Sequence, residues 1–175
     1  MMLVPACKDQ KPKKEIITTK YVPKRLQAPI AMPADVRTSE ADWLQRSYSV
    51  RIERVASDSL PLVKDETGQQ FVDNRITVIV GRQDGSTFFK KVFTKSSFAS
   101  YLDDSFRQNA LLRSMIFLGA KGKELEFAVS VSLPESDDEF IPLKLSVDNL
   151  RGIHIERDTD LDTSGDTTKT ATIEN

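Results

Sequence analysis

The sequence predicts an α+β fold, a mostly antiparallel β-sheet of about six strands with one helical segment packed on its apolar face. Three observations lead to this prediction. Apolar and polar residues alternate through most of residues 47–155, as in strands with one face in water. Only residues 96–115, approximately, show apolar residues at helical spacing. An Asp-Gly pair between two alternating runs predicts a central hairpin.

The central hairpin is expected over residues 74–93, NRITVIVGRQDGSTFFKKVF, with its turn at Asp84-Gly85. A type I′ turn is predicted there, because Asp-Gly tolerates the positive φ that this turn requires at both central positions. The expected register has three facing pairs: Ile76 with Phe93, Val80 with Phe89, and Thr77 with Val92 on the opposite side.

The folded body is expected to begin near Thr38 or Ser39. The stretch Ser39-Glu40-Ala41-Asp42 resembles a helix start, with Trp43 and Leu44 on a short helical turn. Residues 47–56 then alternate as a strand that places three apolar side chains on one face: Tyr48, Val50 and Ile52.

After the hairpin, the helical segment presents apolar residues that include Phe98, Tyr101, Leu102, Phe106, Ala110 and Met115. Asp103 and Asp104 in its middle could divide it into two shorter helices. Helix is expected to give way to strand within the apolar run 111–118. Three further strands are expected, at residues 125–131, 141–147 and 153–155.

The length of 175 residues and the net charge of −1 fit one domain, residues 39–157, with two tails. Residues 8–38 are rich in proline and lysine, which indicates a flexible tether. Residues 158–175 are acidic and lack apolar periodicity, which indicates a disordered tail. The chain has no overall basic character, so we do not expect a nucleic-acid partner.

The first residues, MMLVPACKDQ, resemble the end of a bacterial lipoprotein signal, in which an apolar run leads to a cysteine. The matching stretch is Val4-Pro5-Ala6-Cys7, although proline is unusual in that motif. Residues 1–7 would then be the remnant of the signal, and Cys7 would carry the lipid that holds the protein at a membrane. The alternative is that Cys7 is a single thiol in a disordered arm.

Few residues point to catalysis or to metal binding. The single cysteine excludes an internal disulfide, and the single histidine, His154, has no recognisable nucleophile linked to it. Asp158, Asp160 and Asp162 have the spacing of the first calcium-loop ligands. Thr163 and Lys169 replace the required glycine and glutamate, however, so a solvated tail is favoured. We expect no cofactor and no metal.

Two further groups allow an alternative function. Trp43 and Tyr48 could form a sugar-stacking platform, but a lone tryptophan in a small domain is more often part of the core. Paired carboxylates could hydrolyse an envelope glycan or peptide, and the acidic residues considered for this role are Asp103, Asp104, Asp137 and Asp138.

Five stretches, CKDQKPKKE, SLPLVKDETGQQFVDNRITV, DGSTFFKK, FTKSSFASYLDD and DDEFIPL, give the chain its family resemblance. From Cys7 to about Asp162 it resembles a family of uncharacterised lipoproteins from Bacteroides-type gut bacteria. This resemblance implies an envelope location and a small β-rich fold, and it implies no activity or site residues.

Together these observations predict a lipid-anchored protein of the bacterial cell envelope, on the periplasmic face or the cell surface. Its role is expected to be non-enzymatic, as a binding or accessory protein. The expected partners are the membrane, through the lipid, and a protein or glycan ligand that the sequence does not identify.

Overall fold

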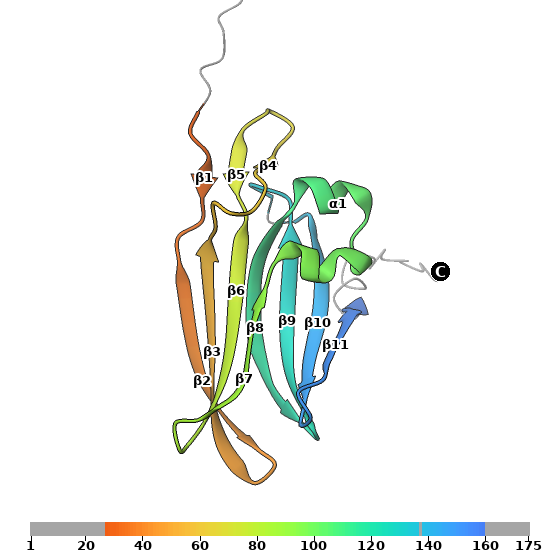
Figure 1. The fold of residues 1–175 in the computed structure, drawn as a ribbon. Helices are drawn as coiled ribbons and strands as arrows, with labels where there is room; N and C mark the ends of the chain where they lie inside the picture. The colour runs from red at the N-terminus through yellow and green to blue at the C-terminus, as the bar shows by residue number, and fades with distance from the viewer. Residues whose placement is uncertain (1–26, 137, 160–175) are drawn as a thin grey trace, which may run out of the picture.

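The computed structural model describes residues 27–136 and 138–159, which fold mainly into two four-stranded antiparallel sheets (Figure 1). The front sheet consists, in spatial order, of β2 (Asp35–Trp43), β3 (Arg46–Ala56), β6 (Asn74–Arg82) and β7 (Thr87–Phe93). The back sheet consists of β8 (Leu111–Lys121), β9 (Glu124–Ser132), β10 (Phe140–Asp148) and β11 (Ile153–Arg157). A small end sheet consists of β1 (Ile30–Ala31), β5 (Gln70–Val72) and β4 (Val63–Lys64).

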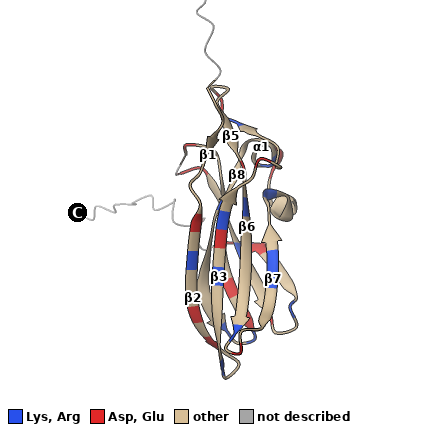
Figure 2. Cartoon of the chain, turned by 60° about the vertical axis from the view of Figure 1, so that its left-hand side comes forward, with Lys and Arg blue, Asp and Glu red and all other residues tan. Residues whose placement is uncertain are grey.

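The two large sheets share one apolar core. Alternate residues of β3 and β6, such as Val50 and Val78, are buried in the same cluster as Phe127 of β9 and Leu145 of β10. The apolar face of each sheet is therefore covered by the other sheet, as in a β-sandwich. Figure 2 shows charges of both signs along β2 and β3, which fits an outer face in contact with water.

The predicted α+β fold is therefore wrong. The helical residues form a 3₁₀ helix, η1 (Lys95–Tyr101), and a short helix, α1 (Asp104–Asn109). They connect β7 to β8 and place Phe98 and Leu102 in the shared core; η1 also contacts β11, and α1 contacts β4 (Figure 1). The predicted division of this segment is confirmed, because Asp103 caps α1 by accepting the Phe106 N–H at 2.9 Å. No helix in the described ranges is long and apolar enough to cross a membrane.

The end of the predicted helical segment is strand β8. Two irregularities in its pairing with β9, between Leu112 and Ser114 and between Phe117 and Gly119, interrupt the alternation. An extra residue in a bulge changes the spacing of inward-facing residues from two to three. Leu112 and Met115, both buried, consequently have a spacing that resembles a helix.

The central hairpin has the predicted register, with Ile76 opposite Phe93, Val80 opposite Phe89 and Thr77 opposite Val92. Its turn differs from the predicted type I′. The Gly85 N–H donates to the Arg82 carbonyl at 3.0 Å and the Arg82 N–H to the Ser86 carbonyl at 2.8 Å. Gly85 has a φ of 81°, whereas Asp84 is not among the positive-φ residues. This is the longer loop in which a type I turn precedes a left-handed glycine.

The predicted helical turn at residues 39–44 is also wrong, because these residues belong to β2 and the turn after it. Leu44 and Gln45, with φ of 51° and 61°, form the two-residue connection between Trp43 and Arg46. β-structure also begins before residue 39, since β1 and the first residues of β2 lie within the segment expected to be a tether. Residues 1–26 and 160–175 lie outside the described structure.

The positive φ of Gln45 predicts that substitution by glycine has opposite effects on stability at Gln45 and at Gln83. Gln45→Gly should raise the free energy of unfolding by about 1 kcal/mol, because glycine adopts positive φ without the cost that other residues have. Gln83→Gly, at a position outside the positive-φ set, should lower it by about 0.5–1 kcal/mol. Urea denaturation of both variants measures this, and equal effects at the two sites would contradict the turn assignment.

Candidate functional site

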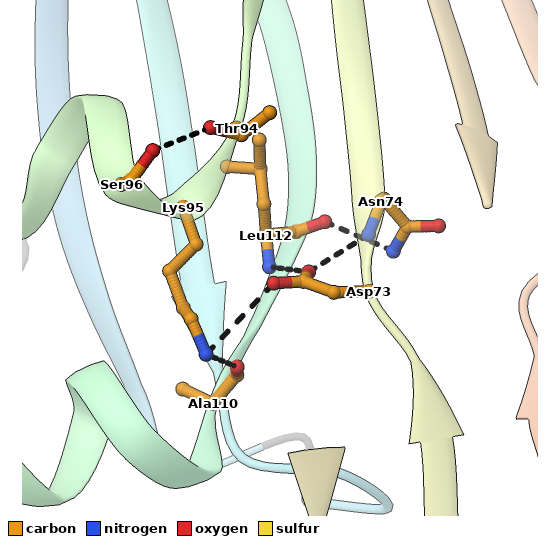
Figure 3. A network of polar contacts seen from close by, with 7 residues as sticks. All are labelled: Asp73, Asn74, Thr94, Lys95, Ser96, Ala110 and Leu112. Carbon is orange, nitrogen blue, oxygen red and sulfur yellow. Dashed lines mark hydrogen bonds and ion pairs between the residues drawn. The ribbon is translucent and has the colours of Figure 1, made fainter. Parts of the chain in front are cut away.

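Asp73 lies where the chain passes from the end sheet into the front sheet, between β5 and β6, and is only 4% exposed. One carboxylate oxygen, Oδ1, accepts the N–H of Asn74 at 2.8 Å and the N–H of Leu112 at 2.9 Å (Figure 3). The Asp73 carbonyl accepts the Ser57 N–H at 2.9 Å. Because Leu112 belongs to β8, this side chain directly connects the front and back sheets.

The second oxygen of Asp73 faces a lysine. Lys95, the first residue of η1, places its Nζ 3.8 Å from Asp73 Oδ2. The same Nζ donates to the Ala110 carbonyl at 2.6 Å, just before β8 (Figure 3). Both side chains are largely buried, with exposures of 15% for Lys95 and 6% for Asp73. The ion pair therefore also holds η1 and the end of α1 to the junction of the two sheets.

Burial favours the neutral form of both groups. It raises the pKa of Asp73, and the N–H donors of Leu112 and Asn74 and the charge of Lys95 oppose this only in part. Burial likewise lowers the pKa of Lys95, and the charge of Asp73 offsets part of that effect. A buried pair with both pKa values shifted is typical of functional sites, although structural ion pairs show it as well.

This pair lies at a pocket of about 450 Å³ between the segment before β4 and the two helices. Its residues form a largely apolar wall with several polar groups: Leu60, Pro61, Leu62, Val63, Asp73, Thr94, Lys95, Ser96, Ala99, Leu102, Arg107 and Gln108. We call this the Lys95 pocket. Two cations, Lys95 and Arg107, and one carboxylate, Asp73, line it. An apolar cavity with a few polar groups is the usual form of a small-molecule site.

The carboxylates considered for hydrolysis have other roles in the structure. Asp103 caps α1, and Asp104 pairs with Arg107 at 2.9 Å. Asp138 is exposed in the loop before β10, and Asp137 lies outside the described residues. A hollow of about 400 Å³ separates α1 from that loop, and the described carboxylates that line it are Asp65, Glu66 and Glu139.

The other candidate residues also have defined places. Trp43 and Tyr48 are buried, with their rings 5.3 Å apart, and each packs edge-on against Phe88. They are part of the core and offer no sugar platform. His154 lies on β11, 3.7 Å from Glu156. Cys7 and residues 160–169 of the rejected calcium loop lie outside the described structure, and the described residues contain no metal-holding group of histidine, cysteine or carboxylate side chains.

The sequence interpretation missed Asp73 and Lys95. A weak signal was present, because Asp73 and Asn74 interrupt an apolar run between Phe71-Val72 and Ile76. A charged residue in such a run is either at a strand boundary or buried with partners. Nothing in the sequence identified Lys95 as the partner of Asp73.

The fold and the pocket define this protein as a small β-sandwich domain with a largely apolar pocket beside a buried ion pair. The family model described as "Domain of unknown function (DUF4738)" matches residues 16–155, which is most of the chain, and the chain belongs to that family. No curated protein matches the sequence.

The raised pKa of Asp73 predicts an unusual pH dependence. Because burial raises the pKa of Asp73 above its ordinary value of 3.8, the folded protein holds the carboxyl proton more tightly than the unfolded chain does. This difference stabilises the folded protein fully below pH 3.8, and the stabilisation is lost as the pH rises through the folded pKa. The stability of the wild type relative to Asp73→Asn, which does not titrate, should therefore fall as the pH rises above 3.8.

Asp84 provides the control, because a hydrogen bond from the Ser86 side chain is the main cause that lowers its pKa. The wild type should gain stability relative to Asp84→Asn as the pH rises from below the folded pKa. Thermal unfolding of the three proteins across acid pH measures both trends. If the melting temperature of the wild type instead rose relative to that of Asp73→Asn as the pH increased, the ion pair with Lys95 would outweigh burial in setting the pKa of Asp73.

Proposed function

We propose that this protein is a lipid-anchored binding protein of the bacterial cell envelope, of the type found in Bacteroides-related species. Its sandwich domain takes a small amphipathic anion, such as a fatty acid, in the Lys95 pocket. The observation that carries this proposal is the combination of apolar walls with two cations, Lys95 and Arg107, among the lining residues.

The anchor is supported by the sequence. Cys7 follows an apolar run and precedes a polar, lysine-rich stretch, as the acylated cysteine of a bacterial lipoprotein does. Gln27, where the described structure begins, is twenty positions after Cys7, and such a length reaches at most roughly 70 Å if fully extended. A lipid at Cys7 would hold the domain near a membrane without a spanning segment.

The chemistry of the pocket supports an amphipathic anion over a glycan. Leu60, Leu62 and Leu102 offer aliphatic surface, which suits a hydrocarbon chain. Lys95 and Arg107 suit a carboxylate, because charge-assisted hydrogen bonds to an anion are stronger than neutral ones. Asp73 already faces Lys95, so Arg107, whose present partner Asp104 is 88% exposed, is the cation that we assign to the ligand's carboxylate.

A hydrolase with paired carboxylates has less support. Asp103 and Asp104 are engaged in capping and pairing at α1, and neither they nor Asp138 line the polar hollow beside that helix. The binding role therefore accounts for more of the described geometry.

The anchor predicts the mass of the mature protein. When it is isolated from the native envelope, its first residue should be Cys7 with two or three acyl chains. Cys7→Ala should move the protein from the membrane fraction to the soluble fraction. An unmodified N-terminus upstream of Cys7 in the native protein would contradict the anchor, and it would leave the pocket proposal standing.

The pocket predicts binding of dodecanoate, measured by isothermal titration calorimetry below the micellar concentration. Ala99→Trp should weaken this binding by about 10-fold or more, because the indole occupies the space that the chain needs. Arg107→Gln should weaken the binding of dodecanoate by about 5–10-fold and leave the affinity for dodecanol nearly unchanged, because only the carboxylate of dodecanoate loses a partner.

Val92→Ser is the matched control, because Val92 is an exposed apolar residue of β7 outside the pocket lining. It should leave dodecanoate binding unchanged. Amide NMR spectra of each variant verify the fold. Failure of the wild type to bind dodecanoate, or equal binding by Ala99→Trp in a folded state, would rule out the Lys95 pocket as the site.

A further inference from the structure

A second cavity, of about 390 Å³, lies beside β8 at the edge of the back sheet and is separate from the Lys95 pocket. It is lined by two arginines, four serines, a methionine and a phenylalanine: Arg54, Arg113, Ser114, Ser130, Ser132, Ser136, Met32 and Phe140. We call it the Arg54 cavity. Among the described residues that line it, none is a carboxylate, whereas both signs of charge are mixed along β2 and β3 (Figure 2).

Arg54 reaches this cavity from the other sheet. It belongs to β3 of the front sheet, yet its Nη1 donates to the Arg113 carbonyl on β8 at 2.8 Å. Its Nη2 donates to the Pro33 carbonyl at 3.1 Å. These two bonds fix the plane of the guanidinium group at the cavity. The Nε is buried and has no hydrogen-bond partner within residues 27–136 and 138–159.

Ser132 supplies a second donor without a partner. This residue of β9 is 2% exposed, and its Oγ has no hydrogen bond in the part of the chain that the structure describes. Ser130, two residues earlier, is on the same face of β9 and pairs across the sheet with Ser114 of β8. Three hydroxyl groups are thus presented on neighbouring positions of one sheet face.

Such an arrangement is costly unless something binds to it. A buried hydroxyl or guanidinium N–H without a partner gives up the hydrogen bond that it makes with water in the unfolded chain. Both atoms belong to residues that line one cavity, so a hydrogen-bonding group bound there would satisfy them. The bonds from Arg54 to the Arg113 and Pro33 carbonyls give two of its guanidinium nitrogens a structural role. They leave Arg54 Nε and the Ser132 hydroxyl without a hydrogen-bond partner in the described residues.

We propose that the Arg54 cavity binds an oxyanion, namely a phosphate, sulfate or carboxylate group. Guanidinium and hydroxyl groups are donors, and an anion accepts from several of them at once. The Ser136 hydroxyl accepts the Glu139 N–H at 3.0 Å, and its own O–H is a further donor at the cavity. This site is independent of the proposed fatty-acid site, because the two cavities share no lining residue.

The test is a titration with inorganic phosphate, followed by amide NMR and by thermal unfolding, with potassium chloride at matched ionic strength as the reference. Phosphate should shift the amide signals of Ser114, Ser130 and Ser132 and raise the melting temperature more than chloride does. Ser132→Ala and Arg54→Lys should each weaken phosphate binding by about 10-fold or more. Ser146→Ala, another buried serine of the back sheet but outside this cavity, should leave it unchanged.

The unliganded stability of Ser132→Ala separates the proposal from a structural role. Because its hydroxyl lacks a partner, the substitution should leave the melting temperature in chloride unchanged or raise it. Vesicles with phosphatidylglycerol, compared with free phosphate, show whether the anion is a lipid headgroup or a small solute. No response to phosphate or sulfate, unchanged phosphate affinity in Ser132→Ala, or a marked loss of unliganded stability in that variant would each overturn the oxyanion site.

Discussion

The position of Asp73 is the constraint on which the assembly of this domain depends. The chain leaves the small end sheet and enters the front sheet at this residue, and its carboxylate bonds the start of β8 in the back sheet. Lys95 brings η1 and the end of α1 to the same point. The apolar faces supply most of the driving force for packing the sheets, but they are non-directional. The buried hydrogen bonds of Asp73 fix where along β6 and β8 the sheets meet, because a shift would leave a carboxylate unpaired.

The same junction explains why both cavities lie near this end of the sandwich. The segment before β4 and the two helices enclose the Lys95 pocket, and Asp73 and Lys95 tie these elements to the sheets. On the other side of β8, Arg54 binds the Arg113 carbonyl, directly after the residue that Asp73 holds. One region thus combines a buried polar junction with two pockets of different lining.

The sequence predicted those parts of the fold in which local pattern and tertiary structure agree. The uninterrupted alternation of Ile76, Val78 and Val80 was enough to give the register of the central hairpin. Strand β8 was missed because bulges gave Leu112 and Met115 a helical spacing, and the turn at Leu44-Gln45 lacks the usual asparagine or glycine. The candidate site was less predictable still. Asp73 and Lys95 meet only through the packing of separate elements, and no spacing rule connects them.

Hydrogen exchange at two amides tests the central claim most directly. The N–H groups of Asn74 and Leu112 both donate to Asp73 Oδ1, one from each sheet. If this carboxylate holds the sandwich together, both amides should exchange only through global unfolding, with the free energy that denaturant unfolding gives for the whole domain. The contrary result is exchange of the Leu112 amide through a local opening of much lower free energy, while the core amides of Val78 and Phe127 stay protected. In that case the packing of the sheets brings Asp73 and Leu112 together, and the Asp73 carboxylate does not determine how the sheets pack.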